Sequence, residues 1–263
     1  MELSVKLNEV FGGDVAPGEM VRRAAGAGAA AVGFWPWYDD DLDVLIDAAE
    51  CAGVDVAYLS GGSPDVEGPE FPLVDPDARE GAMAHLRRAI DVVGDAGSDF
   101  LNVIPGRHHD TMDPAVQHAS VVAALRDVSE RAEHAGVTVL VEPVNTRVDH
   151  PGIYLTSSQK GYEIVDAVDS PNVKLLYDVY HQQISEGNLI DNLRTHVDRI
   201  GHVHVGGVPG RHEPGSGEIN YPAVFSALAG AGYDGYVECE FHPIGPPEDA
   251  IRDVGSMLAD AGQ

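Results

Sequence analysis

Residues 173–205 read VKLLYDVYHQQISEGNLIDNLRTHVDRIGHVHV and contain the clearest repeat unit of the chain. It begins with a short apolar run, Val173–Asp178, and ends with a second one, Gly201–Val205. Between these runs, Asn188–Val197 has the amphipathic spacing of a helix. A strand, a helix and another strand in this order predict one βαβ unit of a parallel sheet.

The same alternation extends over the whole chain. The predicted strands are Leu3–Leu7, Ala31–Trp35, Val54–Leu59, Asp99–Ile104, Thr138–Glu142, Val173–Asp178, Gly201–Val205 and Gly235–Phe241. The predicted helices are Pro17–Gly28, Asp40–Ala52, Asp75–Ala96, Pro114–Ala135, Ser158–Val168, Asn188–Val197, Pro222–Ala231 and Glu248–Ala259. Such strict alternation predicts an α/β fold, a (β/α)8 TIM barrel, with an open doubly wound sheet as the alternative. The length of 263 residues suits one barrel, so we expect a single domain, 1–263.

The composition is strongly acidic, with 43 Asp and Glu against 16 Lys and Arg and a formal net charge of −27. Nucleic acids and anionic membranes bind basic patches, so this balance argues against both as partners. The acidic residues are spread along the chain and do not form a tail. We interpret them as a halophilic adaptation, similar to the carboxylate-rich surfaces of haloarchaeal proteins.

Targeting and membrane segments are not evident in the sequence. Met1–Val10 has neither the basic start nor the long apolar run of a signal peptide. No segment reaches the roughly 18 apolar residues that a membrane span needs. We therefore expect a cytoplasmic protein that does not enter the membrane. The sequence does not define an oligomeric state, and a homo-oligomer is left open.

Polar side chains stand at the carboxyl ends of four successive predicted strands, where a barrel of this type has its active site. They are Glu142, Asp178, His204 and Glu240. Each one alone could cap a loop or pack in the core. Together, buried like charges would repel one another strongly without a cation among them. Three carboxylates and an imidazole suit a divalent metal ion, Mg²⁺ or Mn²⁺ above all, with Co²⁺ and Zn²⁺ as alternatives.

The chain resembles the hydroxypyruvate isomerase family, within the xylose isomerase-like TIM barrel superfamily. The resemblance runs from about Leu101 to Pro243 and is densest in its second half. It rests on LVEPVN (140–145), SSQKGYEIVD (157–166), LLYDVYH (175–181), GNLIDNL (187–193), GRHEPGSGEINY (210–221) and GYDGYVECEFHP (232–243). The segment GRHEPGSGEINY is the most specific of these motifs.

The resemblance implies an isomerase that interconverts hydroxypyruvate and tartronate semialdehyde through an enediolate. It also implies a metal bound by Glu142, Asp178, His204 and Glu240. We assign Glu142 and Glu240 as the pair that removes and returns the proton, because they come from strands on opposite sides of the metal. Which of the two takes the first proton is left open.

Two further residues are expected to bind the substrate, a small keto acid or keto-sugar. His181, three residues after Asp178, is placed to donate to a substrate oxygen. Arg211 suits a substrate carboxylate, because a guanidinium group binds carboxylate bidentately. An ion pair of Arg211 with Glu213 or Glu218 is the alternative.

One position departs from the family pattern and keeps other functions open. Many hydroxypyruvate isomerases have Gln where this chain has His204, whereas His is usual in related ketose 3-epimerases. A ketose 3-epimerase or another keto-sugar isomerase is therefore the alternative function. A DNA-repair endonuclease of the same fold would need a basic face and more His ligands. A sugar-acid-binding protein without activity would not need the pair Glu142 and Glu240.

Overall fold

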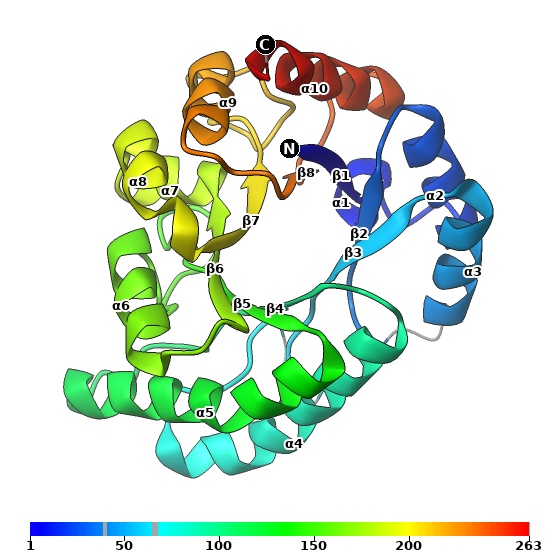
Figure 1. Ribbon diagram of the computed structural model, residues 1–263. Helices are drawn as coiled ribbons and strands as arrows, with labels where there is room; N and C mark the ends of the chain where they lie inside the picture. Colours follow the sequence, from blue (N-terminus) through cyan, green and yellow to red (C-terminus); the bar gives the residue numbers. More distant parts are fainter. Residues whose placement is uncertain (39–40, 65–67, 263) are drawn as a thin grey trace.

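The computed structural model describes residues 1–38, 41–64 and 68–262, and its centre is a closed barrel of eight parallel strands in sequence order (Figure 1). The strands are β1 Glu2–Lys6, β2 Ala31–Phe34, β3 Asp55–Leu59, β4 Phe100–Val103, β5 Thr138–Val141, β6 Val173–Asp178, β7 Ile200–Val205 and β8 Tyr236–Cys239. Pairing of β8 with β1 closes the ring. The predicted (β/α)8 barrel is confirmed, and the doubly wound alternative is wrong.

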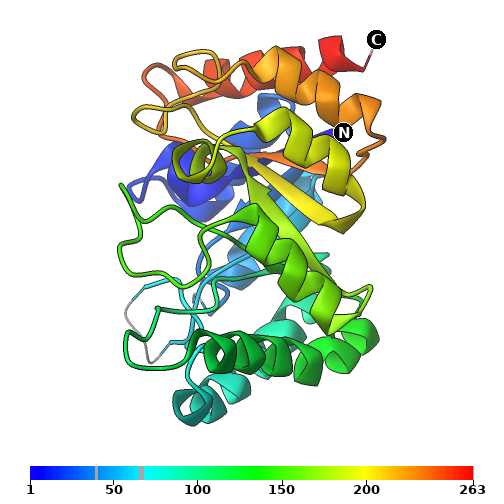
Figure 2. The ribbon, with the colours of Figure 1, turned by 90° about the vertical axis from the view of Figure 1, so that its left-hand side faces the viewer.

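Helices surround the barrel, and Figure 2 shows them from the side along its outer surface. They are α1 Leu7–Phe11, α2 Pro17–Gly26, α3 Leu42–Ala52, α4 Pro76–Asp95, α5 Pro114–Ala135, α6 Ser158–Val168, α7 Val179–Ser185, α8 Leu189–His196, α9 Tyr221–Gly230 and α10 Pro247–Ala261, with a 3₁₀ turn at Val197–Arg199. Among the described residues, no helix is long and apolar enough to cross a membrane.

The predicted helices are all present, and two short helices were missed. These two, α1 and α7, follow directly after β1 and β6 and are only 5 and 7 residues long. That length is too short for a helical apolar period to stand out in the sequence. The predicted start of α3 at Asp40 lies outside the described residues.

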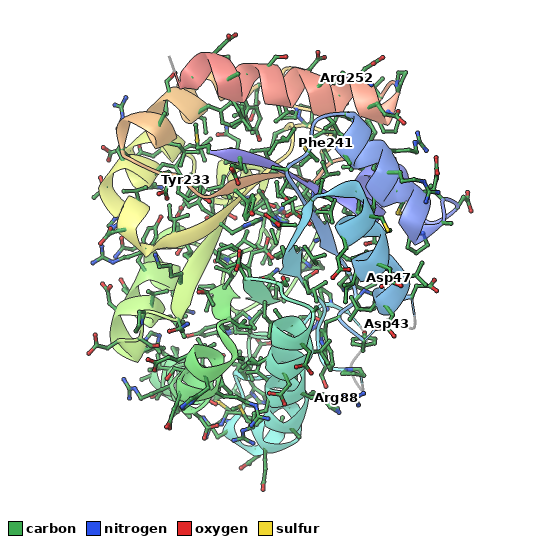
Figure 3. The ribbon with its side chains drawn as sticks, turned by 45° about the vertical axis from the view of Figure 1, so that its right-hand side comes forward. Asp43, Asp47, Arg88, Tyr233, Phe241 and Arg252 are labelled. Atoms are coloured by element: carbon green, nitrogen blue, oxygen red, sulfur yellow. The ribbon has the colours of Figure 1, made fainter. Side chains whose placement is uncertain are left out.

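Charged side chains occupy the outer faces of the helices. Figure 3 shows Asp43 and Asp47 on α3 and Arg88 on α4, all of which are exposed. The apolar faces of the same helices pack on the barrel, as Leu45 of α3 and Leu86 of α4 illustrate, each fully buried. The barrel is thereby covered on its outside, and its polar side chains are confined to its interior and its rim.

The interior of the barrel contains a polar layer below the rim. Glu238 of β8 is fully buried, and its Oε2 accepts a hydrogen bond from Ser4 Oγ at 2.9 Å and lies 3.0 Å from His202 Nε2. The ring of Tyr58 stacks on His202 with centroids 5.3 Å apart. Space for this layer comes from Gly33 of β2, where an added Cβ would lie 2.3 Å from Glu238 Oε1.

We expect Gly33→Ala to lower the free energy of unfolding by about 1–3 kcal/mol, because the methyl group would overpack the interior. The Cβ would also meet Tyr58 Cδ1 at 2.6 Å, and the barrel wall leaves little room to move. Denaturant unfolding of the purified chain measures the change.

The matched control is Gly81→Ala at an exposed position of α4, where an added Cβ has no described atom within 4 Å. It should leave stability unchanged or raise it by up to about 1 kcal/mol, because Ala is the better helix former. Equal stability of Gly33→Ala and the natural chain would contradict this account of the interior.

Candidate active site

The four predicted rim residues come together in the structure, and we call them the rim cluster. Glu142 follows the last residue of β5, Asp178 ends β6, His204 lies in β7 and Glu240 follows β8. All four are buried, and one potential ligand atom of each lies within 4.8 Å of the others. The carboxyl ends of four neighbouring strands thus meet at one point, as the parallel barrel requires.

The rim cluster fits a divalent cation by the chemistry of its donors. It offers three carboxylates and one imidazole, a set that suits Mg²⁺ or Mn²⁺ and also accommodates Zn²⁺ or Co²⁺. Nε2 of His204 is buried and has no hydrogen-bond partner among the described residues. A second group of possible ligands, His202, His204 and Glu238, lies below and shares His204 with the rim cluster.

Two cations already touch the rim cluster. Lys6 Nζ forms an ion pair with Glu240 Oε1, and Arg211 NH2 lies 2.5 Å from Glu240 Oε2 and 3.4 Å from Asp178 Oδ2. Lys6 and Arg211 offset two of the three negative charges that the ionised carboxylates would carry. A bound divalent ion would supply the remaining positive charge.

The loop between β7 and α9 holds Arg211 in place. Tyr221 joins the two ends of this loop, because its hydroxyl donates to Gly206 O at 2.7 Å and accepts from Gly206 N at 2.9 Å. Arg211 itself has φ of +52°, a left-handed conformation that non-glycine residues rarely adopt and that is often found at functional sites. Its guanidinium lies over the Tyr180 ring, 4.9 Å from the centroid.

The alternative partners predicted for Arg211 are occupied elsewhere. Glu213 Oε2 accepts from the backbone N of Ile244 at 3.0 Å, and Glu218 Oε1 accepts from Gln183 Nε2 at 3.1 Å. The alternative, an ion pair within the loop, is therefore wrong, and Arg211 faces Asp178 and Glu240.

The charges around the rim cluster separate the pKa values of its carboxyl groups. Burial raises the pKa of Asp178 to about 7, although the Arg211 guanidinium acts to lower it. Burial would also raise the pKa of Glu240, but Arg211, Lys6 and His204 together hold that pKa well below its ordinary value. Glu240 is thus kept as an anion, whereas burial favours the protonated form of Asp178.

His181 also reaches the site, from the first turn of α7. Its backbone N donates to Asp178 Oδ1 at 3.0 Å, so that Asp178 caps this helix. Its ring is buried, with Nε2 3.7 Å from Asp178 Oδ2. Burial and the nearby Arg211 lower the pKa of His181 well below its ordinary value, which keeps the ring neutral.

A cavity of about 170 Å³ opens beside the rim cluster. Of the predicted residues, its lining includes Glu142, Glu240, His181 and Arg211. Lys6 and Asn102, from the ends of β1 and β4, line it as well, and Asn102 Nδ2 donates to Glu142 Oε2 at 2.5 Å.

Sequence reasoning missed several residues of this cavity. They are Glu9, Ser60, Gly61, Pro69 and His150. Glu9 lies on the short helix α1, and its only sequence signal is a polar residue soon after a strand end. The others come from loops whose path over the rim has no periodic signal.

Comparisons with known proteins agree with this geometry. Residues 21–261 match the family described as xylose isomerase-like TIM barrel. A 2-oxo-tetronate isomerase of Cupriavidus necator is 35% identical over 221 residues, which cover 84% of this chain and 85% of that protein. The hydroxypyruvate isomerase of Escherichia coli is 37% identical over 99 residues, 38% of each chain.

Solved structures share the whole fold. A crystal structure from Brucella melitensis, described as an AP endonuclease of family 2, aligns with a TM-score of 0.86 and 28% identity. The alignment covers 97% of this chain and 99% of that one. The arrangement of the barrel is therefore shared from end to end.

We expect the purified chain to bind one Mn²⁺ at the rim cluster, and Asp178→Asn to weaken that binding on the order of 100-fold, because it removes a charged ligand. Asn can still cap α7, so the local backbone should be preserved. Isothermal titration calorimetry measures both the stoichiometry and the affinity.

Glu9→Gln is the matched control, because Glu9 also lines the cavity but lies outside the rim cluster. The affinity of this variant for Mn²⁺ should stay within about threefold of that of the natural chain, as expected for the loss of a single more distant charge. An equal loss in both variants would show that general negative charge, and not these four ligands, binds the ion.

Proposed function

Because this chain belongs to the xylose isomerase-like TIM barrel family, we propose that it is a metal-dependent isomerase that interconverts hydroxypyruvate and tartronate semialdehyde. The observation that carries the proposal is the pair Glu142 and Glu240, which lie within one cluster of potential metal ligands and line one small cavity. The 2-oxo-tetronate isomerase and hydroxypyruvate isomerase relatives support an isomerase.

A divalent metal held by the rim cluster would polarise the substrate oxygens and stabilise the negative charge that develops on them. The reaction itself moves one proton from the hydroxyl-bearing carbon to the neighbouring carbonyl carbon, and the hydroxyl proton passes to the former carbonyl oxygen. One of Glu142 and Glu240 accepts this proton, the other gives a proton to the second carbon, and proton exchange with solvent restores both carboxyl groups. Asn102 orients Glu142 by its hydrogen bond, and Lys6 and Arg211 orient Glu240.

The remaining polar groups suit a small anionic substrate. Arg211 reaches the cavity with its guanidinium and is the partner we propose for a carboxylate. His181 is the donor we propose for a substrate oxygen. The cavity of about 170 Å³ is small beside the roughly 300–1,000 Å³ of pockets for drug-sized ligands, so it favours a substrate of few carbons.

Two other functions have weaker support. A ketose 3-epimerase is favoured by one observation, the imidazole of His204 in the rim cluster, and is the second candidate. An AP endonuclease would have to bind DNA with 16 basic residues against 43 acidic ones. Phosphate binding depends on basic surface, so the charge argues against that activity.

We expect the chain to convert hydroxypyruvate in high salt with added Mn²⁺ or Mg²⁺ and to lose this activity in EDTA. Glu142→Gln and Glu240→Gln should each lower kcat by about 10²- to 10⁴-fold, the usual contribution of a general acid or base. Coupled detection of tartronate semialdehyde measures the rate. Near-normal activity in either variant would overturn its assignment.

The same assay separates the candidates when 2-oxo-tetronate and a panel of ketoses are added. Arg211→Ala should raise KM for a carboxylate-bearing substrate by about 10-fold or more, because it removes a charged hydrogen bond. The KM for a neutral ketose should rise far less in the same variant. Conversion of ketoses alone would favour the epimerase, and no metal-dependent conversion by the folded chain would reject an isomerase.

A further inference from the structure

His181, Asn145 and Asp149 form a chain of three polar side chains that runs from the cavity to the surface. The amide of Asn145 stands between the other two, with its Nδ2 2.7 Å from His181 Nδ1 and 2.7 Å from Asp149 Oδ2. The backbone N of Asn145 also donates to His181 Nδ1, at 3.2 Å. Asn145 closes the LVEPVN segment after β5, so the rim cluster and this chain share one loop.

The orientation of the Asn145 amide is fixed by its own oxygen. Oδ1 accepts from the backbone N of Val148 at 2.9 Å and from that of Asp149 at 3.4 Å. The NH₂ group must therefore face His181 and Asp149. Because an amide N–H only donates, His181 Nδ1 must accept, and the ring proton resides on Nε2.

Asp149 would favour the opposite tautomer if it could reach the ring. Its Oδ2 lies 3.9 Å from His181 Nδ1, beyond a hydrogen bond but close enough to approach after a small movement. A carboxylate beside an imidazole nitrogen accepts the N–H and so holds the proton there. Asn145 stands between the two groups and gives one N–H to each, and Asp149 is also hydrogen-bonded to the Tyr180 side chain.

We propose that Asn145 is a positioning residue that separates Asp149 from His181 and thereby keeps the ring proton on Nε2, at the cavity. Nε2 is at the opposite edge of the ring from Asn145, 3.7 Å from Asp178 Oδ2, and the ring lines the cavity. The rings of Tyr180 and His150, with centroids 5.2 and 5.4 Å from that of His181, pack around it. His181 then presents an N–H donor where a substrate oxygen would lie, a use that rests on the proposed function.

The tautomer can be measured without any substrate. In the full chain labelled with ¹⁵N-histidine, long-range ¹H–¹⁵N correlation spectra distinguish protonated from unprotonated ring nitrogens. The His181 signals are those lost in His181→Asn. The natural chain should show a protonated Nε2 and an unprotonated Nδ1, both without metal and with Mg²⁺. A protonated Nδ1 would overturn the proposal.

Two variants test the role of Asn145 itself. Asn145→Ala should move a proton onto Nδ1, because Asp149 can then approach the ring. Asn145→Ala combined with Asp149→Ala should return the proton to Nε2, because the backbone N of Asn145 still donates to Nδ1. Asp149→Ala alone is the control and should leave the tautomer unchanged. The proposal would be overturned if the ring proton of His181 stayed on Nε2 in Asn145→Ala. It would also be overturned if the proton stayed on Nδ1 in the double variant.

Kinetics give a second readout. Asn145→Ala should lower kcat about 10²-fold with a smaller change in KM, the effect of losing one donor to a developing charge. The double variant should recover most of this loss, whereas a purely structural role predicts that the second substitution adds damage. If the chain converts none of the substrates, the spectra still decide the tautomer, and only the proposed function fails.

Discussion

Three carboxylates buried within reach of one another are the constraint on which this site depends. Glu142, Asp178 and Glu240 have potential ligand atoms within 4.8 Å, and burial makes their mutual repulsion costly. Two cations, Lys6 and Arg211, relieve part of it. Barrel closure imposes the proximity, because each carboxylate belongs to the end of a different strand. The remaining charge explains why the site is suited to a divalent ion.

The surrounding structure serves to hold these charges. Below the rim, Ser4, His202 and Glu238 form a second polar layer for which Gly33 leaves space. Above it, Tyr221 ties the ends of the loop that carries Arg211. Lys6 and Arg211, two of the few basic side chains, are turned inward to the rim cluster.

Much of this arrangement could be predicted from the sequence, because alternating strands and helices fix a barrel and a barrel fixes where strand ends meet. The alternation of strands and helices and the meeting of strand ends in a barrel are enough to predict the rim cluster. Contacts that depend on side-chain reach could not be predicted. The ion pair of Lys6 with Glu240 joins residues 234 positions apart. The link from Asp149 through Asn145 to His181 depends on amide orientation, which no sequence pattern encodes.

The most direct test of the central claim is anomalous diffraction at the manganese edge, from crystals grown with Mn²⁺. We predict one strong peak inside the barrel, in contact with Glu142, Asp178, His204 and Glu240. A peak among His202, His204 and Glu238 instead, or no peak within the barrel, would contradict it.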